Sequence, residues 1–256
     1  MKAFFTLLLP FMLLNSTTAC SSENKNESQF HQFEDAAASV LVFTKTEGWR
    51  HDSIEPGVDA VVALGITNGF NVTWTEDSEY FNDENLAAYD AVLFLNTTLT
   101  VFNDTQREAF KRFIQNGGGF AGVHSATDTE YDWPWYGELV GAYFDNHPPG
   151  VHEARIFVEN HDHPSTQHLD EYWIKVDEWY NFGYMNENVN VLLKLDTDSF
   201  EGSDHPGNHP IAWYHEFDGG RSFYTGLGHT IESFSEPLFL EHLLGGINYA
   251  IGPTEN

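Results

Sequence analysis

Residues 117–128 read GGGFAGVHSATD, and this stretch joins a predicted helix to a predicted buried strand. Before it, residues 105–116 carry apolar side chains at helical spacing, with Asn103 and Gln106 placed as a capping box. The glycines end that helix, and the apolar residues after them are typical of a short buried strand that stops at His124. Many α/β enzymes present a nucleophile at such a strand-to-turn junction. The feature to explain here is an imidazole in that position.

Similar alternations of strand and helix precede this stretch. Short β-branched or alternating apolar segments predict strands at 39–45, 70–75 and 89–96. Between the first two, apolar residues at helical spacing predict a helix that is capped by Ser53 and ends near Asn68. Strands and helices in this order favour an α/β fold with a doubly wound, mostly parallel sheet.

The C-terminal half has a different pattern. Segments 152–160 and 188–196, and the pair of strands joined by a glycine turn within 210–228, are predicted as antiparallel additions to the sheet. A closing helix begins at Pro237. Because the sequence has neither internal repeats nor an interdomain linker, we predict one domain over residues 38–252.

Composition excludes several classes of function. The chain has 256 residues, 41% of them hydrophobic and 15% aromatic, which is enough for one domain with a full core. It carries 39 acidic against 11 basic residues, a net charge of -28 at pH 7. Such a chain is a poor electrostatic partner for nucleic acid or an anionic membrane surface, so we expect neither as a partner. Solubility in a salty medium is the simplest interpretation of the acidity.

The N-terminus has the pattern of a targeting segment. A short basic start precedes the apolar run AFFTLLLPFMLL and then small residues up to Ala19 and Cys20. Residues 1–19 resemble a bacterial lipoprotein signal peptide, after which Cys20 becomes the lipidated first residue. Ordinary cleavage after Ala19 is the alternative, because Thr17 is unusual three positions before the cysteine. With residues 20–37 as a polar tether, we expect an exported protein, lipid-anchored at the periplasmic face or the outer membrane of a bacterium.

Histidines and carboxylates follow several predicted strands, at the edge where open α/β sheets place their ligand crevice. Imidazole and carboxylate suit proton transfer, and together they also suit zinc or a similar divalent transition metal. Histidines in polar or proline-rich loops, such as His147 and His209, are weaker candidates. The candidates for acid–base catalysis are His124, Asp128, Glu178 and His229. The candidate metal ligands are His51, His124, Glu178 and His229.

Aromatic residues cluster close to the same candidates in the sequence. Indole and phenol rings stack on the apolar face of a sugar ring, while neighbouring acids hold its hydroxyl groups. Ordinary core packing is the alternative for each ring. The candidate sugar-binding residues are Trp133, Trp135, Tyr136, Trp179, Tyr180 and Asp177.

Five segments occur in an order that is specific as a set: FTKTEGWRHDSI, YDAVLFLNTT, FIQNGGGFAGVHSATD, VDEWYNF and HPIAWYHEFDGGRSFYTGLGH. Together they resemble the ThuA-like family, which is named for a trehalose-utilisation protein, over about residues 39–251. The resemblance implies a flavodoxin-like sheet similar to class I glutamine amidotransferases, with a nucleophile elbow. That elbow reads Gly-x-Cys-x-Gly, and the matching residues here are 122–126, with His124 in place of the cysteine. Cys20 is the only cysteine, so amidotransferase and cysteine-protease chemistry are excluded, and Ser125 is a weaker candidate nucleophile.

The resemblance also implies a role in sugar catabolism, with keto-sugars as the expected substrates. The leading hypothesis is an exported enzyme acting on a 3-keto-glycoside. A base removes the acidified C2 proton, the enolate expels the C1 substituent, and water adds back. Asp177 and Glu178 are a poor pair for ordinary glycoside hydrolysis, because neighbours on a strand point apart. The alternative is a non-catalytic carbohydrate-binding lipoprotein, which has no need for several ionisable groups at one point.

Overall fold

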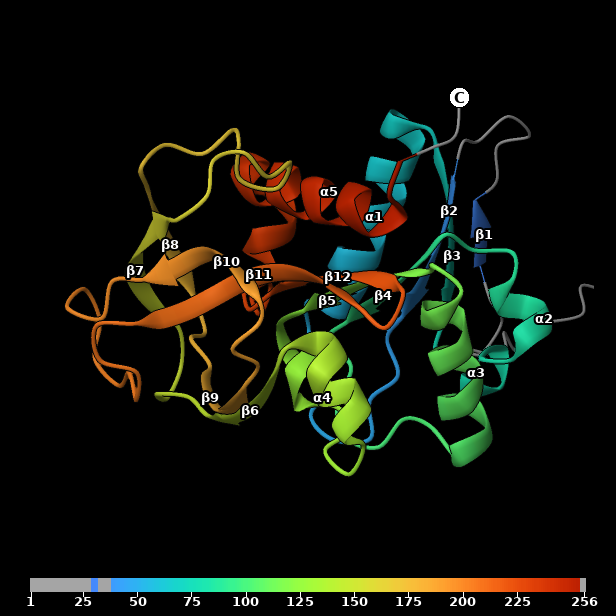
Figure 1. Cartoon of the computed structure of the whole chain (residues 1–256). Coiled ribbons are helices and arrows are strands. Elements are labelled where there is room, and N and C mark those ends of the chain that lie inside the picture. The colour runs from blue at the N-terminus through green and yellow to red at the C-terminus, as the bar shows by residue number, and fades with distance from the viewer. Residues whose placement is uncertain (1–28, 32–37, 254–256) are drawn as a thin grey trace, which may run out of the picture.

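The computed structural model describes residues 29–31 and 38–253 (Figure 1). A ten-stranded sheet has the order β1-β3-β2-β4-β5-β12-β11-β10-β7-β8, and β6 pairs with β9 in a second sheet. The strands are β1 (Gln29–His31), β2 (Ala38–Phe43), β3 (Phe70–Thr75), β4 (Ala91–Leu95), β5 (Gly119–Val123), β6 (Ala142–Asn146), β7 (His152–Val158), β8 (Tyr172–Asp177), β9 (Asn181–Met185), β10 (Asn190–Leu195), β11 (His209–Phe217) and β12 (Gly220–Thr225).

The neighbouring strands β3, β2, β4, β5 and β12 are parallel and form the centre of the domain. Helices α1 and α5 pack on one face of these strands, and α3 and α4 pack on the other (Figure 1). The predicted doubly wound parallel core with antiparallel additions in the C-terminal half is therefore confirmed. The helices are α1 (Ile54–Asn68), α2 (Asp83–Leu86), α3 (Asp104–Gln115), α4 (Pro134–Val140) and α5 (Pro237–Ile251), with single 3₁₀ turns η1 (Ser78–Tyr80), η2 (His124–Asp128) and η3 (Glu232–Ser235).

The predicted helix ends are found where the sequence signals lie. The Asn103 side chain accepts from the Gln106 amide, and the Gln106 side chain accepts from the Asn103 amide, so α3 has the expected capping box. Helix α1 begins directly after Ser53, but the Ser53 hydroxyl donates to the carbonyl of Gly228 instead of capping the helix. Ser53 thus ties the start of α1 to the segment that follows β12.

Aromatic side chains fill the core under the carboxyl ends of the parallel strands. Phe81 lies 4.6 Å from Phe43 and 4.4 Å from Phe102 between ring centroids, and Phe94 stacks on Phe110 at 5.4 Å. Rings that interlock in this way leave little room for the strand ends to move. The residues that follow β2, β4 and β5 are therefore held on a rigid base.

Glycine at the start of β5 has a packing reason. A Cβ on Gly119 would lie 1.9 Å from the carbonyl oxygen of Ala250, near the end of α5. Only a residue without a side chain lets this helix approach the strand so closely. The glycine run that ends α3 therefore also sets the distance between β5 and α5.

The antiparallel half curls back over the parallel half. In the hydrogen-bonding order β8 lies five strands from β5, which is about 24 Å in a flat sheet at about 4.8 Å per strand. Yet Oε2 of Glu178, the residue directly after β8, lies 3.4 Å from Nε2 of His124, the residue directly after β5. The twist and coiling of the sheet therefore bring the ends of both strands to one crevice.

The N-terminal predictions fall mostly outside the described residues. Within the predicted tether, Gln29–His31 form β1, which pairs antiparallel with β3. Residues 1–19 and Cys20 are not described, so the signal peptide and the lipid anchor stay predictions. Among the described residues, no helix combines the length and the apolar character that crossing a bilayer requires.

Candidate functional site

His124 is the apex of the turn between β5 and η2. Its φ of 49° lies in the left-handed region, which is uncommon for a residue with a side chain and often marks a functional turn. The ring is fully buried, and its Nδ1 lies 2.9 Å from the carbonyl oxygen of Gly226. Since a carbonyl only accepts, Nδ1 carries the proton, and Nε2 of the neutral ring is left with a free lone pair.

Nε2 of His124 faces two other candidate residues. It lies 3.2 Å from Nδ1 of His229 and 3.4 Å from Oε2 of Glu178, and the last two atoms are 3.2 Å apart. Burial raises the pKa of Glu178, but the neighbouring imidazoles of His124 and His229 outweigh it and hold this pKa well below its usual range. Burial lowers the pKa of His229, but the hydrogen bond to Glu178 outweighs it and the net shift is upward. By these distances, Nε2 of His124, Nδ1 of His229 and Oε2 of Glu178 form a nearly equilateral triangle.

His51, from the segment between β2 and α1, adds a fourth group. Its ring lies 5.0 Å from His124 and 5.1 Å from His229 between centroids, edge-on to both. One nitrogen or carboxylate oxygen from each of the four side chains lies within 4.8 Å of all the others. Burial and the neighbouring imidazoles lower the pKa of His51 to about 2. The structure thus brings together the four predicted ligands, and their chemistry suits a divalent transition metal.

Asp177 holds the backbone on which His229 lies. Its carboxylate is fully buried and accepts from the amides of Gly228 at 3.0 Å and His229 at 3.1 Å, and from the hydroxyl of Ser233 at 3.2 Å. The Lys175 ammonium lies 3.7 Å away. With its oxygens directed at these groups, Asp177 fixes the loop after β12.

A cavity of about 480 Å³ opens over the cluster. Asp128 is on its wall, where burial raises the pKa of the carboxyl although the hydroxyl of Tyr131 donates to its Oδ1 at 2.6 Å. The cavity is therefore lined by both ionisable and aromatic groups, as small-molecule sites usually are. The lining residues are Trp49, His51, Asp128, Phe144, His147, Glu178, Tyr180 and His229.

The predicted sugar-binding residues are mostly placed elsewhere. Of the six, Tyr180 lines the cavity, and its ring lies 4.1 Å from that of His124. The remaining aromatic rings are not among the residues that line this cavity, and they have other partners. Trp133 stacks on Trp135 at 4.9 Å, Trp135 donates to Asp218, Tyr136 donates to the carbonyl of Ala126, and Trp179 donates to the carbonyl of His152.

Sequence reasoning missed two residues that line the cavity, Trp49 and Phe144, and ranked a third, His147, among the weaker candidates. Nδ1 of His147 lies 3.2 Å from Oε1 of Glu178. The ring centroids of Phe144 and Tyr180 are 4.1 Å apart. Trp49 is on the segment after β2. The position of Trp49, two residues before His51, was an available signal. The loop around His147 gave none, because two prolines follow it directly.

The weaker candidates have structural partners. His209 is fully buried, accepts from the hydroxyl of Ser203 at Nδ1 and donates from Nε2 to the carbonyl of Tyr180. It therefore supports the backbone of a cavity residue from behind. Ser125 is also fully buried, with its hydroxyl 3.5 Å from Nδ1 of His51.

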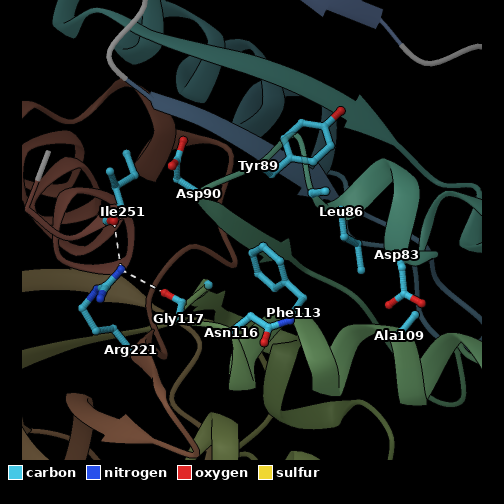
Figure 2. A pocket seen from close by; sticks show the side chains of 12 residues that line it. Asp83, Leu86, Tyr89, Asp90, Ala109, Phe113, Asn116, Gly117, Arg221 and Ile251 are labelled. Carbon is cyan, nitrogen blue, oxygen red and sulfur yellow. Dashed lines mark hydrogen bonds between the residues drawn. The ribbon is translucent and has the colours of Figure 1, made fainter. Parts of the chain in front are cut away.

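A second cavity, of about 380 Å³, lies at the opposite edge of the sheet. Figure 2 shows that Arg221 in this cavity donates to the carbonyls of Gly117 and Ile251. Asp83 is held by Arg112, and Asp90 accepts from the amide of Ser39. The charged groups of this cavity thus have partners within the fold, and the cavity lies at the amino ends of the strands. The crevice over His124 is the better candidate site.

The family model for ThuA, described as trehalose utilisation, matches residues 39–250. The chain belongs to the ThuA family. The predicted membership is thereby confirmed, and it places this ThuA chain in the context of carbohydrate metabolism.

Solved structures similar to this ThuA chain support the same fold. A ThuA-like protein from Bacteroides uniformis has 21% identity and a TM-score of 0.72, covering 86% of this chain and 94% of that one. One from Parabacteroides merdae has 17% identity and a TM-score of 0.65, with 86% and 92% covered. The β-galactosidase from Bacillus circulans sp. alkalophilus has 15% identity and a TM-score of 0.54, with 83% and 31% covered. At these identities the likeness shows the fold alone. No curated protein matches the sequence.

The fold of this ThuA chain is the predicted glutamine-amidotransferase-like one. Its elbow presents His124, and the single cysteine of the sequence, Cys20, is remote from it in the chain. Amidotransferase chemistry needs a thiolate at the elbow. The elbow of this chain offers an imidazole in place of that thiolate.

Proposed function

We propose that this chain is a carbohydrate-active enzyme that cleaves 3-keto-glycosides and holds a divalent transition metal, such as zinc, on His51, His124, Glu178 and His229. The observation that carries the proposal is the hydrogen bond from Nδ1 of His124 to the carbonyl of Gly226. It fixes the tautomer and aims the lone pair of Nε2 at the other ligands, as protein groups behind metal-bound histidines usually do.

The spacing of the cluster fits a metal of this kind. Ligand atoms bound at about 2.0–2.1 Å in a tetrahedron lie about 3.3–3.4 Å from one another. The distances among His124, His229 and Glu178 are 3.2, 3.2 and 3.4 Å. His124 is fully buried and is not among the residues that line the cavity, so a ligand role suits it better than that of a base. When bound, such a metal would polarise the carbonyl group of the substrate.

Asp128 is the group that we assign to proton transfer. Tyr131 donates to its Oδ1, and Oδ2 is the oxygen assigned to the substrate. As carboxylate it takes the C2 proton, and the electron pair of that bond enters the enolate formed with the 3-keto group. The enolate then forms the C1–C2 double bond and expels the C1 oxygen, which receives the same proton from Asp128. Water adds to C1, giving its proton to Asp128 and then to C2. Because burial raises the pKa of Asp128, its carboxylate is a stronger base than an exposed one.

The carbohydrate class rests on two supports. The family is one of trehalose utilisation, and the aromatic rings of Phe144 and Tyr180 line the cavity beside the ionisable groups. A carbohydrate-binding lipoprotein without catalysis is the other candidate. It would explain the rings, but it has no use for a cluster of four buried or half-buried ligand-type side chains.

The decisive experiment combines metal analysis with turnover. Purified full-length protein is incubated with zinc, manganese or nickel, desalted, and analysed for bound metal. We expect about one equivalent in the wild type, loss in His124→Ala and Glu178→Gln, and no change in the control His161→Ala, because His161 is exposed. The wild type should cleave 3-ketotrehalose but not trehalose, and chelation should abolish the cleavage. A protein that retains none of these metals and cleaves no keto-glycoside would refute the proposal, and sugar binding without turnover would favour the alternative.

We also propose that the chain is exported and anchored through a lipid on Cys20. The support is the signal pattern in residues 1–20. In a bacterial host, labelling with radioactive palmitate should mark the wild type and leave Cys20→Ser unlabelled. Equal labelling of the two proteins would contradict the anchor.

A further inference from the structure

The feature that leads beyond the proposed function is Trp49 at the mouth of the cavity. Its side chain is 73% exposed, the largest fraction among the exposed large hydrophobic residues of the described chain. It nevertheless lines the cavity that contains His51, Glu178 and His229. A large aromatic ring that is exposed to water beside a polar pocket indicates a ligand contact more strongly than hydrophobic residues scattered over the surface do.

The backbone that carries Trp49 is fixed. The amide of Gly48 donates to the hydroxyl of Thr98 at 3.0 Å, and this hydroxyl donates to the carbonyl of Trp49 at 3.3 Å. The amide of Glu47 donates to the carbonyl of Thr98 at 3.0 Å. The guanidinium of Arg50 is held by Glu55 and Glu76. The indole is therefore presented to solvent by an ordered segment, which lowers the entropic cost of binding a ligand against it.

The size of the cavity indicates how many rings it accepts. Its volume is about 480 Å³. A protein cavity of about 150 Å³ accepts one benzene-sized ring. The crevice is thus too large for one sugar ring alone, and it has aromatic residues at two places. Tyr180 lies beside the ionisable cluster, because its ring centroid is 4.1 Å from that of His124, and the Phe144 ring is 4.1 Å from that of Tyr180. Trp49, in contrast, is at the exposed side.

We infer that Trp49 forms a second subsite, on which the second sugar ring of a disaccharide stacks while the keto-sugar ring occupies the inner site. This inference rests on the proposed function and names the substrate class more closely: glycosides whose leaving group is itself a sugar ring. Trp49 contributes binding and takes no part in proton transfer. It selects for the leaving group, because a methyl group in that position would not reach the indole.

The test compares two substrates that share the inner ring, 3-ketotrehalose and methyl 3-keto-α-glucoside. Trp49→Ala should lower kcat/KM for 3-ketotrehalose about tenfold, mainly through KM, as expected for the loss of one stacking contact. For the methyl glycoside, kcat/KM should stay within about twofold. Trp49→Phe should recover most of the loss. Tyr172→Ala, which removes a 53% exposed ring on β8, is the matched control and should change neither value.

The outcomes separate the two proposals. If the wild type cleaves both glycosides and Trp49→Ala lowers both values equally, or lowers neither, the second subsite is wrong and the proposed function stands. If the wild type cleaves neither glycoside, the proposed function is wrong, and the inference is overturned with it. Because Trp49 is exposed, the variants should fold, and unchanged thermal unfolding checks this.

Discussion

Asp177 provides the sharpest test of how the site is built. Its buried carboxylate accepts from the amides of Gly228 and His229 and from the hydroxyl of Ser233, so Asp177→Ala removes the acceptor that these three donors share. Each bond to a charged group contributes about 1.5–3 kcal/mol, and such terms are not additive. Breaking a buried charged network by removing one member costs about 3–5 kcal/mol. Lys175 keeps Glu236 at 2.6 Å, which places the expected loss toward the lower end.

Urea unfolding followed by tryptophan fluorescence measures this loss. We expect the free energy of unfolding to fall by about 3–4 kcal/mol in Asp177→Ala. Asp177→Asn should fall less, because the amide keeps the size of the carboxyl and one accepting oxygen. Asp170→Ala, at an exposed position, is the control and should change stability by less than about 0.5 kcal/mol.

A sugar-binding role for Asp177 predicts the opposite result. Substitution would then weaken sugar binding and leave stability nearly unchanged. A loss below about 1 kcal/mol in Asp177→Ala, with m-values unchanged, would refute the assignment of Asp177 to the support of His229.

Three further outcomes follow from buried groups. Burial lowers the pKa of His242 to about 3. The stabilising contribution of His242 is therefore complete above the unfolded pKa of about 6.5, and it is lost as the pH falls toward 3. In this pH range, His242→Gln should make the fall in the free energy of unfolding shallower by up to about 1.4 kcal/mol per pH unit. Gly119→Ala should lower the thermal midpoint clearly, because its Cβ would overlap the carbonyl of Ala250 at the cost of about 1–3 kcal/mol or more. Glu130→Ala should cost about 3–5 kcal/mol in urea unfolding, since fully buried Glu130 is paired with Arg107 and accepts two backbone amides; a near-neutral result would contradict this.

Local signals predicted much of the fold. The capping box of α3, the end of α1 and the strand before His124 depend on residues within one or two turns of each other, and each was found. Three of the four clustered side chains could be expected at one edge for a related reason. His51, His124 and His229 follow β2, β5 and β12, and parallel strands end at the same side of the sheet.

Long-range geometry could not be derived from the sequence, although Glu178 was among the predicted ligands. Glu178 follows a strand that would lie about 24 Å away in a flat sheet, and only the curl of the antiparallel half brings it to His124. His147, directly after β6 of the second sheet, also lies beside Glu178. Aromatic residues show the converse difficulty, because the composition of a segment does not reveal whether a ring such as Trp179 turns into the core or into a pocket.

The elbow connects the fold to the chemistry. The left-handed backbone at its apex aims the side chain of that residue toward the crevice, whichever residue it is. Here the hydroxyl of Tyr224 holds this backbone by donating to the carbonyl of His124. A cysteine there would offer a nucleophilic thiol. An imidazole whose Nδ1 is bound to Gly226 is instead a fixed lone pair at the floor of the site, covered by His229 and Glu178. The same backbone feature therefore suits metal ligation once histidine replaces the thiol, and in the proposed function proton transfer is assigned to Asp128 instead.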